Sequence, residues 1–130
     1  MIAVDTNVLL RALVDDPADP GQCAAARALV AGAGQVRVAS IIFVETLWVL
    51  HKRYRATRRE VARIARGLLD HPRYEIEARG ELGQALEIFS TSTVDFADAV
   101  ALADARRVGV ALHTFDRRLA KLPDAEGVTE

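Results

Sequence analysis

Two aspartates just beyond predicted strands are the first residues that suggest chemistry. The apolar start "MIAV" runs into Asp5, and the apolar segment 110–114 is followed after one residue by Asp116. Because the carboxyl ends of parallel strands meet at one rim of a sheet, we expect both carboxylates at that rim. Carboxylate oxygens gathered there are ligands for hard divalent cations. Either residue taken alone is explained as well by an N-cap, since a helix is predicted after each.

Glu45 is the most informative acidic residue, because it interrupts the apolar segment "SIIFVETLWVL" (40–50). This segment predicts a helix that is apolar nearly all round and is therefore buried. A carboxylate inside such a helix is costly unless it is paired, protonated or bound to a cation. A buried salt bridge with an arginine is the alternative explanation, and we favour a functional site.

Asp95 and Asp98 are three residues apart in "DFADAVALADA" (95–105), so they share one face of a predicted helix. Asp95 falls in the first turn, where it is a cap, a partner of the helix dipole or a site neighbour. Asp98 lies deeper among apolar residues, and we interpret it as the site acid. Asp104 is near the basic end of the same helix and is interpreted as a surface residue. Thr114 offers a hydroxyl beside Asp116.

Four carboxylates in one pocket would repel one another, by roughly 4 kcal/mol for a pair ~4 Å apart at an effective dielectric near 20. A divalent cation removes that repulsion, and oxygen ligands alone favour Mg²⁺ or Mn²⁺. The three histidines, His51, His71 and His113, are scattered and make no zinc spacing. A pocket of this kind activates water and stabilises an in-line displacement at phosphorus.

The elements that position these acids alternate between strands and helices. Strands are predicted at 2–5, 36–39, 74–77 and 110–114, with a last edge strand at 128–129. Helices are predicted over 7–14, from the Asp19–Pro20 pair to Gly32 or Gly34, from a capping Ser40 to about Tyr54, from the Thr57–Glu60 capping box to Leu69, over 82–89, over 94–107, and briefly after Asp116. This alternation predicts an α/β fold, a three-layer α/β/α sandwich with a mostly parallel, about five-stranded sheet.

Length and composition favour one domain over residues 1–130, with 51% hydrophobic and 27% charged residues. No apolar run is long enough to span a membrane, and the start lacks the pattern of a secretory signal. The single cysteine, Cys23, excludes an intramolecular disulfide and fits a reduced, cytoplasmic setting. We therefore expect a cytoplasmic protein with no membrane partner.

Charge is distributed unevenly along the chain, although the formal net charge is only -1. Residues 51–67 contain seven Lys and Arg residues against the single acid Glu60. A local basic patch holds phosphates even when the whole chain is nearly neutral, whereas the simpler explanation is a solvated helix face. The candidates for RNA contact are Arg53, Arg55, Arg58 and Arg59.

Four segments in order resemble one known family. They are "VDTNVLLR" at the start, a glutamate in the helix after the second strand, "DFADAVALA", and "TFDRRLAKL". The set is similar to PIN-domain proteins of the VapC group, ribonuclease toxins of bacterial and archaeal toxin–antitoxin pairs. Each motif alone is weak, but four in order over nearly the whole chain are specific.

The resemblance implies metal-dependent cleavage of RNA with Mg²⁺ or Mn²⁺. It maps an acidic quartet onto Asp5, Glu45, Asp98 and Asp116, with Asp5, Asp98 and Asp116 as the metal ligands. It also implies supporting roles for Asn7 beside the first acid and Thr114 beside the last, while Asp95 is a less regular position. A homodimer and an antitoxin that lays a peptide over helices 40–55 and 57–69 are the implied protein partners.

Two other readings of the residues compete with a nuclease. A phosphatase or phosphotransfer domain would use Asp5 as nucleophile, but such folds usually need a second aspartate two residues on, where this chain has Asn7. They also need a lysine near a later strand end, and neither Lys52 nor Lys121 ends a predicted strand. A non-catalytic α/β binding protein would use its acids as caps and salt bridges, and metal binding separates that reading from the nuclease.

Overall fold

The computed structural model describes all of residues 1–130, which form two compact units. The first unit covers Met1–Ala78 and the second covers Arg79–Glu130.

The first unit is built on a parallel three-stranded sheet in the order β1-β2-β3. Ile2 pairs with Val36, and Val36 pairs in turn with Tyr74. Parallel strands require a long connection between them, and here each connection consists of two helices. The strands are β1 (Ile2–Ala3), β2 (Val36–Val38) and β3 (Tyr74–Ile76), and the helices are α1 (Thr6–Leu13), α2 (Pro20–Ala33), α3 (Ser40–Lys52) and α4 (Arg58–Asp70).

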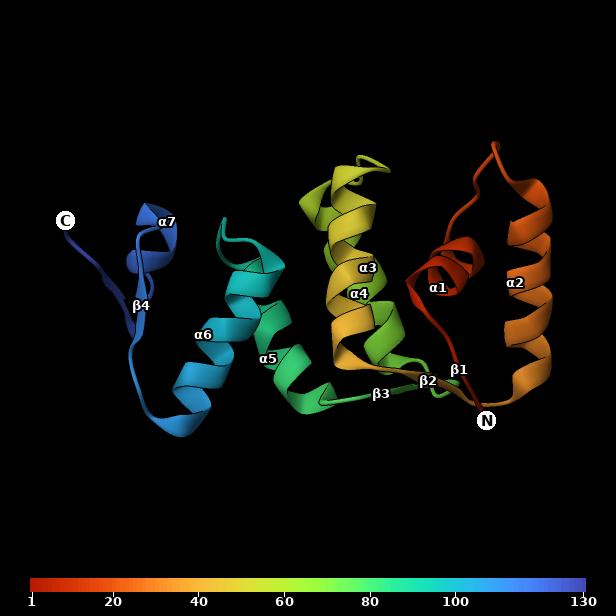
Figure 1. The fold of residues 1–130 in the computed structure, drawn as a ribbon. Helices are drawn as coiled ribbons and strands as arrows, with labels where there is room; N and C mark the ends of the chain where they lie inside the picture. Colours follow the sequence, from red (N-terminus) through yellow and green to blue (C-terminus); the bar gives the residue numbers. More distant parts are fainter. The chain divides into compact units, whose positions relative to one another are not determined.

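The helices of the first unit pack in pairs, with α1 beside α2 and α3 beside α4 (Figure 1). Helix α4 carries its apolar residues on one face, as the sequence predicts, while arginines occupy the other face. The fully buried residues come from the helices and from the central strand β2, and they include Leu9, Val36, Val38, Phe43, Leu47, Leu50 and Val61.

The helices of the first unit begin near the predicted residues, but the predicted residue does not always form the cap. Asp19 occupies the N-cap of α2 without a side-chain cap bond, and Pro20 takes the first helical position. The prediction that Ser40 caps α3 is wrong, because Ala39 is the N-cap and Ser40 is already helical. The Ser40 amide and hydroxyl instead both donate to Glu77 Oε1, each at 2.9 Å. Glu77 thus anchors the start of α3 from a site 37 residues away.

The predicted capping box at the start of α4 is confirmed. The Glu60 amide donates to the Thr57 hydroxyl at 3.1 Å, and the Thr57 amide donates to the Glu60 carboxylate at 3.1 Å. The same contacts lower the pKa of Glu60. Two of the helix's free N–H groups are therefore satisfied locally.

Replacing Thr57 with alanine is expected to lower the free energy of unfolding by about 1 kcal/mol, because the cap is lost. Thr57→Ser keeps the hydroxyl and serves as the matched control, for which we expect little change. Denaturant unfolding of the three proteins measures both effects. Equal destabilisation by serine and alanine would show that the methyl group of Thr57, and not its hydroxyl, stabilises this helix start.

The second unit pairs two long helices with a small parallel sheet. Helices α5 and α6 lie side by side (Figure 1), and Phe89 meets Phe96 edge to face at 5.6 Å between ring centroids. Gly109 ends α6 in the left-handed conformation with φ 78°, as expected for a helix C-cap. The elements are α5 (Arg79–Ser90), α6 (Phe96–Val108), β4 (Leu112–Thr114), α7 (Arg117–Ala120) and β5 (Ala125–Gly127).

The last strand lies earlier than predicted. It covers Ala125–Gly127 and pairs with β4, and only the Val128 amide extends the pairing by donating to Thr114 at 2.8 Å. The apolar residues of 110–114 lead us to expect a buried strand, and this expectation is wrong, since Leu112 and Thr114 are half-buried and His113 is exposed. A strand with one neighbouring strand and a four-residue helix beside it has little to bury it on both faces.

The predicted α/β class with parallel strands is confirmed. Five strands are present, and all three pairings are parallel, with three strands in the sheet of the first unit and two in that of the second. None of the helices combines the length and the apolar character that crossing a bilayer would require.

Candidate functional site

Asp5 has the capping role, one of the two that the sequence leaves open. It is the N-cap of α1, and its Oδ1 accepts a hydrogen bond from the Val8 amide at 3.0 Å. This bond fixes the carboxylate and uses only one of its two oxygens, while the side chain stays exposed. Asp5 and Asn7 line one hollow of about 300 Å³ between α1 and α2. The capping role therefore leaves the second oxygen available for a ligand.

Glu45 is exposed, so the prediction that it is buried is wrong. Helix α3 has two faces, because Phe43, Thr46 and Leu47 point into the core while Glu45 lies on the outer stripe. Ile41 and Trp48, four residues before and three after Glu45, are 72% and 57% exposed. The sequence does not reveal this exposed stripe, because its residues Ile41 and Trp48 are also apolar. No arginine forms a salt bridge with Glu45.

Asp95 and Asp116 both lie within electrostatic reach of Asp98 in the second unit. Partial burial is the main cause that raises the pKa of Asp98, and the negative charges of Asp95 and Asp116 raise it further. Arg118 opposes this effect. Asp98 in the first turn of α6, Asp95 at its N-cap and Asp116 at the start of α7 therefore influence one site within this unit.

Asp116 is held firmly at the start of α7. Its Oδ1 accepts hydrogen bonds from the amides of Arg118 at 2.8 Å and Leu119 at 3.0 Å, and these bonds lower its pKa. The Thr114 hydroxyl accepts from the Asp116 amide at 2.9 Å. Oδ2 is left with only a long contact of 4.0 Å to Arg118. Thr114 therefore supports the turn that presents Asp116.

Asp95 stands at the N-cap of α6 without the side-chain bond that a cap usually makes. Neither its carboxylate nor that of Asp98 accepts a hydrogen bond in the structure. Asp104 is exposed and pairs with Arg107 at 2.7 Å, which confirms its interpretation as a surface residue. No three His, Cys, Asp or Glu side chains converge closely enough to hold a metal ion.

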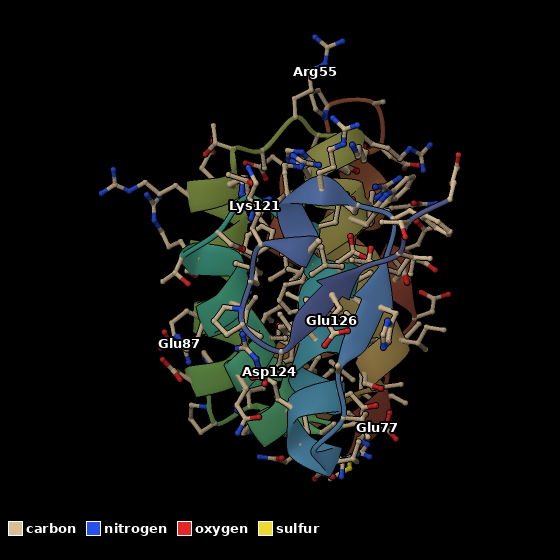
Figure 2. The ribbon with its side chains drawn as sticks, turned by 90° about the vertical axis from the view of Figure 1, so that its left-hand side faces the viewer. Arg55, Glu77, Glu87, Lys121, Asp124 and Glu126 are labelled. Atoms are coloured by element: carbon tan, nitrogen blue, oxygen red, sulfur yellow. The ribbon has the colours of Figure 1, made fainter.

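The predicted basic candidates gather where α3 ends and α4 begins. Arg53 and Arg55 belong to the connection between the helices, and Arg58 and Arg59 open α4. Arg53, Arg55 and Arg59 are exposed, and Figure 2 shows the Arg55 side chain extending away from the ribbon. These residues all lie in the first unit, as does Asp5.

A polar cluster around Arg11 was missed by the sequence analysis. Arg11 donates to Tyr54 at 2.6 Å and to Gln22 at 3.1 Å, and it lies 3.4 Å from Asp16. Tyr54 in turn donates to Asp16 at 2.9 Å, which is the main cause that lowers the pKa of Asp16. The i, i+4 spacing of Asn7 and Arg11 on one face of α1 was the only local signal, since Tyr54 is distant in the chain.

A model of the PIN domain matches residues 2–125. The chain belongs to the PIN domain family. PIN domains are typically metal-dependent nucleases. The match spans both units of this PIN domain and includes every acid of the predicted quartet.

Solved structures provide a further comparison for this PIN domain. It is similar to VapC20 of Mycobacterium tuberculosis, described as a sarcin–ricin loop cleaving toxin, with 20% identity and a TM-score of 0.46. The likeness covers 92% of this chain and 93% of that chain. The likeness is distant, and the cleavage of the sarcin–ricin loop is stated of VapC20 alone. No curated protein matches the chain significantly.

Proposed function

We propose that this PIN domain is a divalent-metal-dependent endoribonuclease and the toxin of a toxin–antitoxin pair. The observation that carries the proposal is the group of carboxylates around Asp98 in the second unit, where partial burial and then the charges of Asp95 and Asp116 raise the pKa of Asp98. Carboxylates that repel one another are costly in a folded protein, and a bound cation removes that cost. The toxin role is supported by the four VapC-like motifs. The same proposal takes residues 1–130 to act as a single PIN domain.

The proposed metal ligands are Asp5, Asp98 and Asp116, with Glu45 as the fourth catalytic acid. Their donor set, carboxylate oxygens without nitrogen or sulfur, fits Mg²⁺ or Mn²⁺. When bound, such an ion lowers the pKa of water and neutralises charge at a phosphoryl oxygen. Glu45, exposed and without an ion pair, is free to accept a proton from water.

The supporting residues act by fixing the acids. Thr114 holds the turn that carries Asp116, and backbone amides hold one oxygen each of Asp5 and Asp116. Asn7, exposed beside Asp5, is proposed to orient it or a ligand next to it. Asp95 is proposed to keep the electrostatic potential at Asp98 negative, which favours cation binding.

The proposed partners are RNA, a cognate antitoxin and a second copy of the chain. Arg53, Arg55, Arg58 and Arg59 are the proposed contacts to the RNA backbone, because clustered arginines bind phosphates by charge and by paired hydrogen bonds. For the antitoxin, the exposed apolar side chains of Ile41 and Trp48 on α3 are the available docking residues. A cytoplasmic location follows from the same proposal, since its RNA substrate is there.

Incubation of the purified protein with total cellular RNA tests the proposal. We expect cleavage fragments with Mg²⁺ or Mn²⁺ and none after removal of the metal with EDTA, with activity restored when the metal is returned. A preparation freed of antitoxin by denaturation and refolding is required, because a bound antitoxin would mask the site. RNA that stays intact with every metal, together with no binding of Mn²⁺, would contradict the proposal and favour a non-catalytic binding protein.

A further inference from the structure

The cluster around Arg11 borders a polar hollow whose lining also includes Asn7 and Arg53, two residues with proposed roles. Its volume is about 290 Å³, against roughly 30 Å³ for one water molecule in the liquid. It lies between the C-terminal ends of α1 and α3. Asn7 and Arg11 line both this hollow and the one that Asp5 lines. The lining residues are Asn7, Leu10, Arg11, Asp16, Val49, Arg53 and Tyr54.

Arg11 is held in place by its neighbours and still has donors to offer. Its side chain is only 18% exposed, and Nε and Nη1 donate to Gln22 and Tyr54. Nη2 donates to no protein group. A guanidinium fixed in this way loses little rotamer entropy when it binds a ligand, which is the benefit of preorganisation.

The other polar groups of the hollow favour an anion. Arg53 is exposed and makes no ion pair, so its whole guanidinium is available. The Asp16 carboxylate is already engaged by Tyr54, by Arg11 and by the Ala18 amide. Two arginines against one engaged aspartate leave the lining net positive. Planar guanidinium groups match the oxygens of a phosphate by paired hydrogen bonds.

We propose that this hollow binds one backbone phosphate of a single-stranded nucleic acid, held by Arg11 and Arg53 with Asn7 at its edge. Leu10 and Val49 form the apolar wall for the adjoining sugar. The hollow shares Asn7 and Arg11 with the one that Asp5 lines, so the phosphate site adjoins the hollow of a proposed metal ligand. This inference rests on the proposed function, because it takes the ligand to be the backbone of the substrate.

Binding of a short fluorescein-labelled single-stranded deoxyoligonucleotide, measured by anisotropy in EDTA over a range of salt concentrations, tests this inference. EDTA removes any cleavage, so the readout is binding alone. We expect Arg53→Gln to weaken binding about tenfold, as for the loss of a charged hydrogen bond. Replacing Arg11 and Arg53 together is expected to reduce the slope of log K against log[salt] by about 0.7, the value for one phosphate of a single strand.

The matched control is Arg107→Gln, which removes the same charge from an exposed pair with Asp104 on α6. We expect this variant to bind as the wild type does. Because Arg11 also links α1 to Tyr54, Arg11→Lys is included, which keeps the charge but loses the fork and is expected to weaken binding. If the Arg11 and Arg53 variants bound with the affinity and salt slope of Arg107→Gln, the phosphate site would be refuted.

The two proposals fail in different ways. If the Arg53 and Arg11 variants bind normally while the wild type cleaves RNA with metal, the phosphate site alone is wrong. If the wild type binds the oligonucleotide through these arginines and cleaves no RNA with any metal, the nuclease proposal is wrong and the phosphate site stands.

Discussion

Asp98→Asn is expected to reduce the rate of RNA cleavage by about a hundredfold or more, the scale of losing one group that stabilises the transition state electrostatically. The free energy of unfolding of the metal-free protein should not fall. Burial and the charges of Asp95 and Asp116 disfavour the Asp98 carboxylate, and an amide of the same shape relieves that cost. Function and stability would then change in opposite directions, as is common at functional sites.

The pH dependence of stability gives this prediction a second readout. Because the folded state raises the pKa of Asp98, the folded protein binds more protons than the unfolded chain between the ordinary pKa and the raised one. The contribution of Asp98 is fully present below the ordinary pKa and is lost as the pH rises through the raised value. We expect the metal-free wild type to lose this contribution across that window, and Asp98→Asn to lack the loss.

Thermal unfolding and cleavage rates of Asp98→Asn are best compared with those of Asp104→Asn. Asp104 lies on the same helix but is exposed and paired with Arg107, so its replacement should leave cleavage unchanged. Wild-type activity in Asp98→Asn would remove this residue from the site. A loss of activity accompanied by a lower Tm would indicate a structural role instead.

Asp5→Asn is expected to weaken the binding of Mn²⁺ by at least about a hundredfold, because even groups behind the ligands change metal affinity by about 10–100-fold. The helix α1 should remain intact. Asparagine caps a helix about as well as aspartate does, so the bond from the Val8 amide to the capping side chain is retained. The variant therefore removes the charge without removing the cap.

Calorimetric titration with Mn²⁺ measures this effect without any knowledge of the RNA. Asp19→Asn is the matched control, since Asp19 opens α2 in the same unit and makes no cap bond. Asp5→Ala should lose both metal affinity and about 1 kcal/mol of stability, because the cap is lost as well. Unchanged Mn²⁺ binding in both Asp5→Asn and Asp98→Asn would overturn the metal assignment and leave Asp5 with its capping role alone.

Features set by residues close in the chain were predictable from the sequence. The capping box joins Thr57 and Glu60, which are three residues apart in the chain. Gly109 ends α6 in a left-handed conformation, which glycine adopts without help from distant residues. The apolar face of α4 was predictable for the same reason. These features required no knowledge of what packs against the helices.

Features set by distant residues were not predictable. Ser40 resembles a cap, but Glu77 competes for its amide and hydroxyl from the end of β3. Glu45 seemed buried because composition does not reveal which stripe of α3 faces the core. The cluster of Arg11 with Tyr54 joins residues 43 apart, and the spacing within α1 shows only half of it.

For the candidate site, the sequence indicates which acids to consider, whereas it does not indicate the environment of each carboxylate. Asp98 and Asp116 are both aspartates near the ends of elements, yet burial and like charges raise the pKa of one, and backbone amides lower the pKa of the other. This difference depends on which N–H groups and charges surround each carboxylate, and only the folded arrangement provides that information.

The two helix-capping acids, Asp5 and Asp116, also have a genetic consequence. Codons for aspartate and asparagine differ in the first base alone, and asparagine preserves a cap. One base change at either position thus yields a protein that folds, keeps its surface and, under the proposed function, has no activity. Under the proposed function, the protein encoded by such an allele would still bind the antitoxin. In a cell carrying both alleles, the inactive product would therefore compete for antitoxin and release active toxin, so the inactive allele would act dominantly.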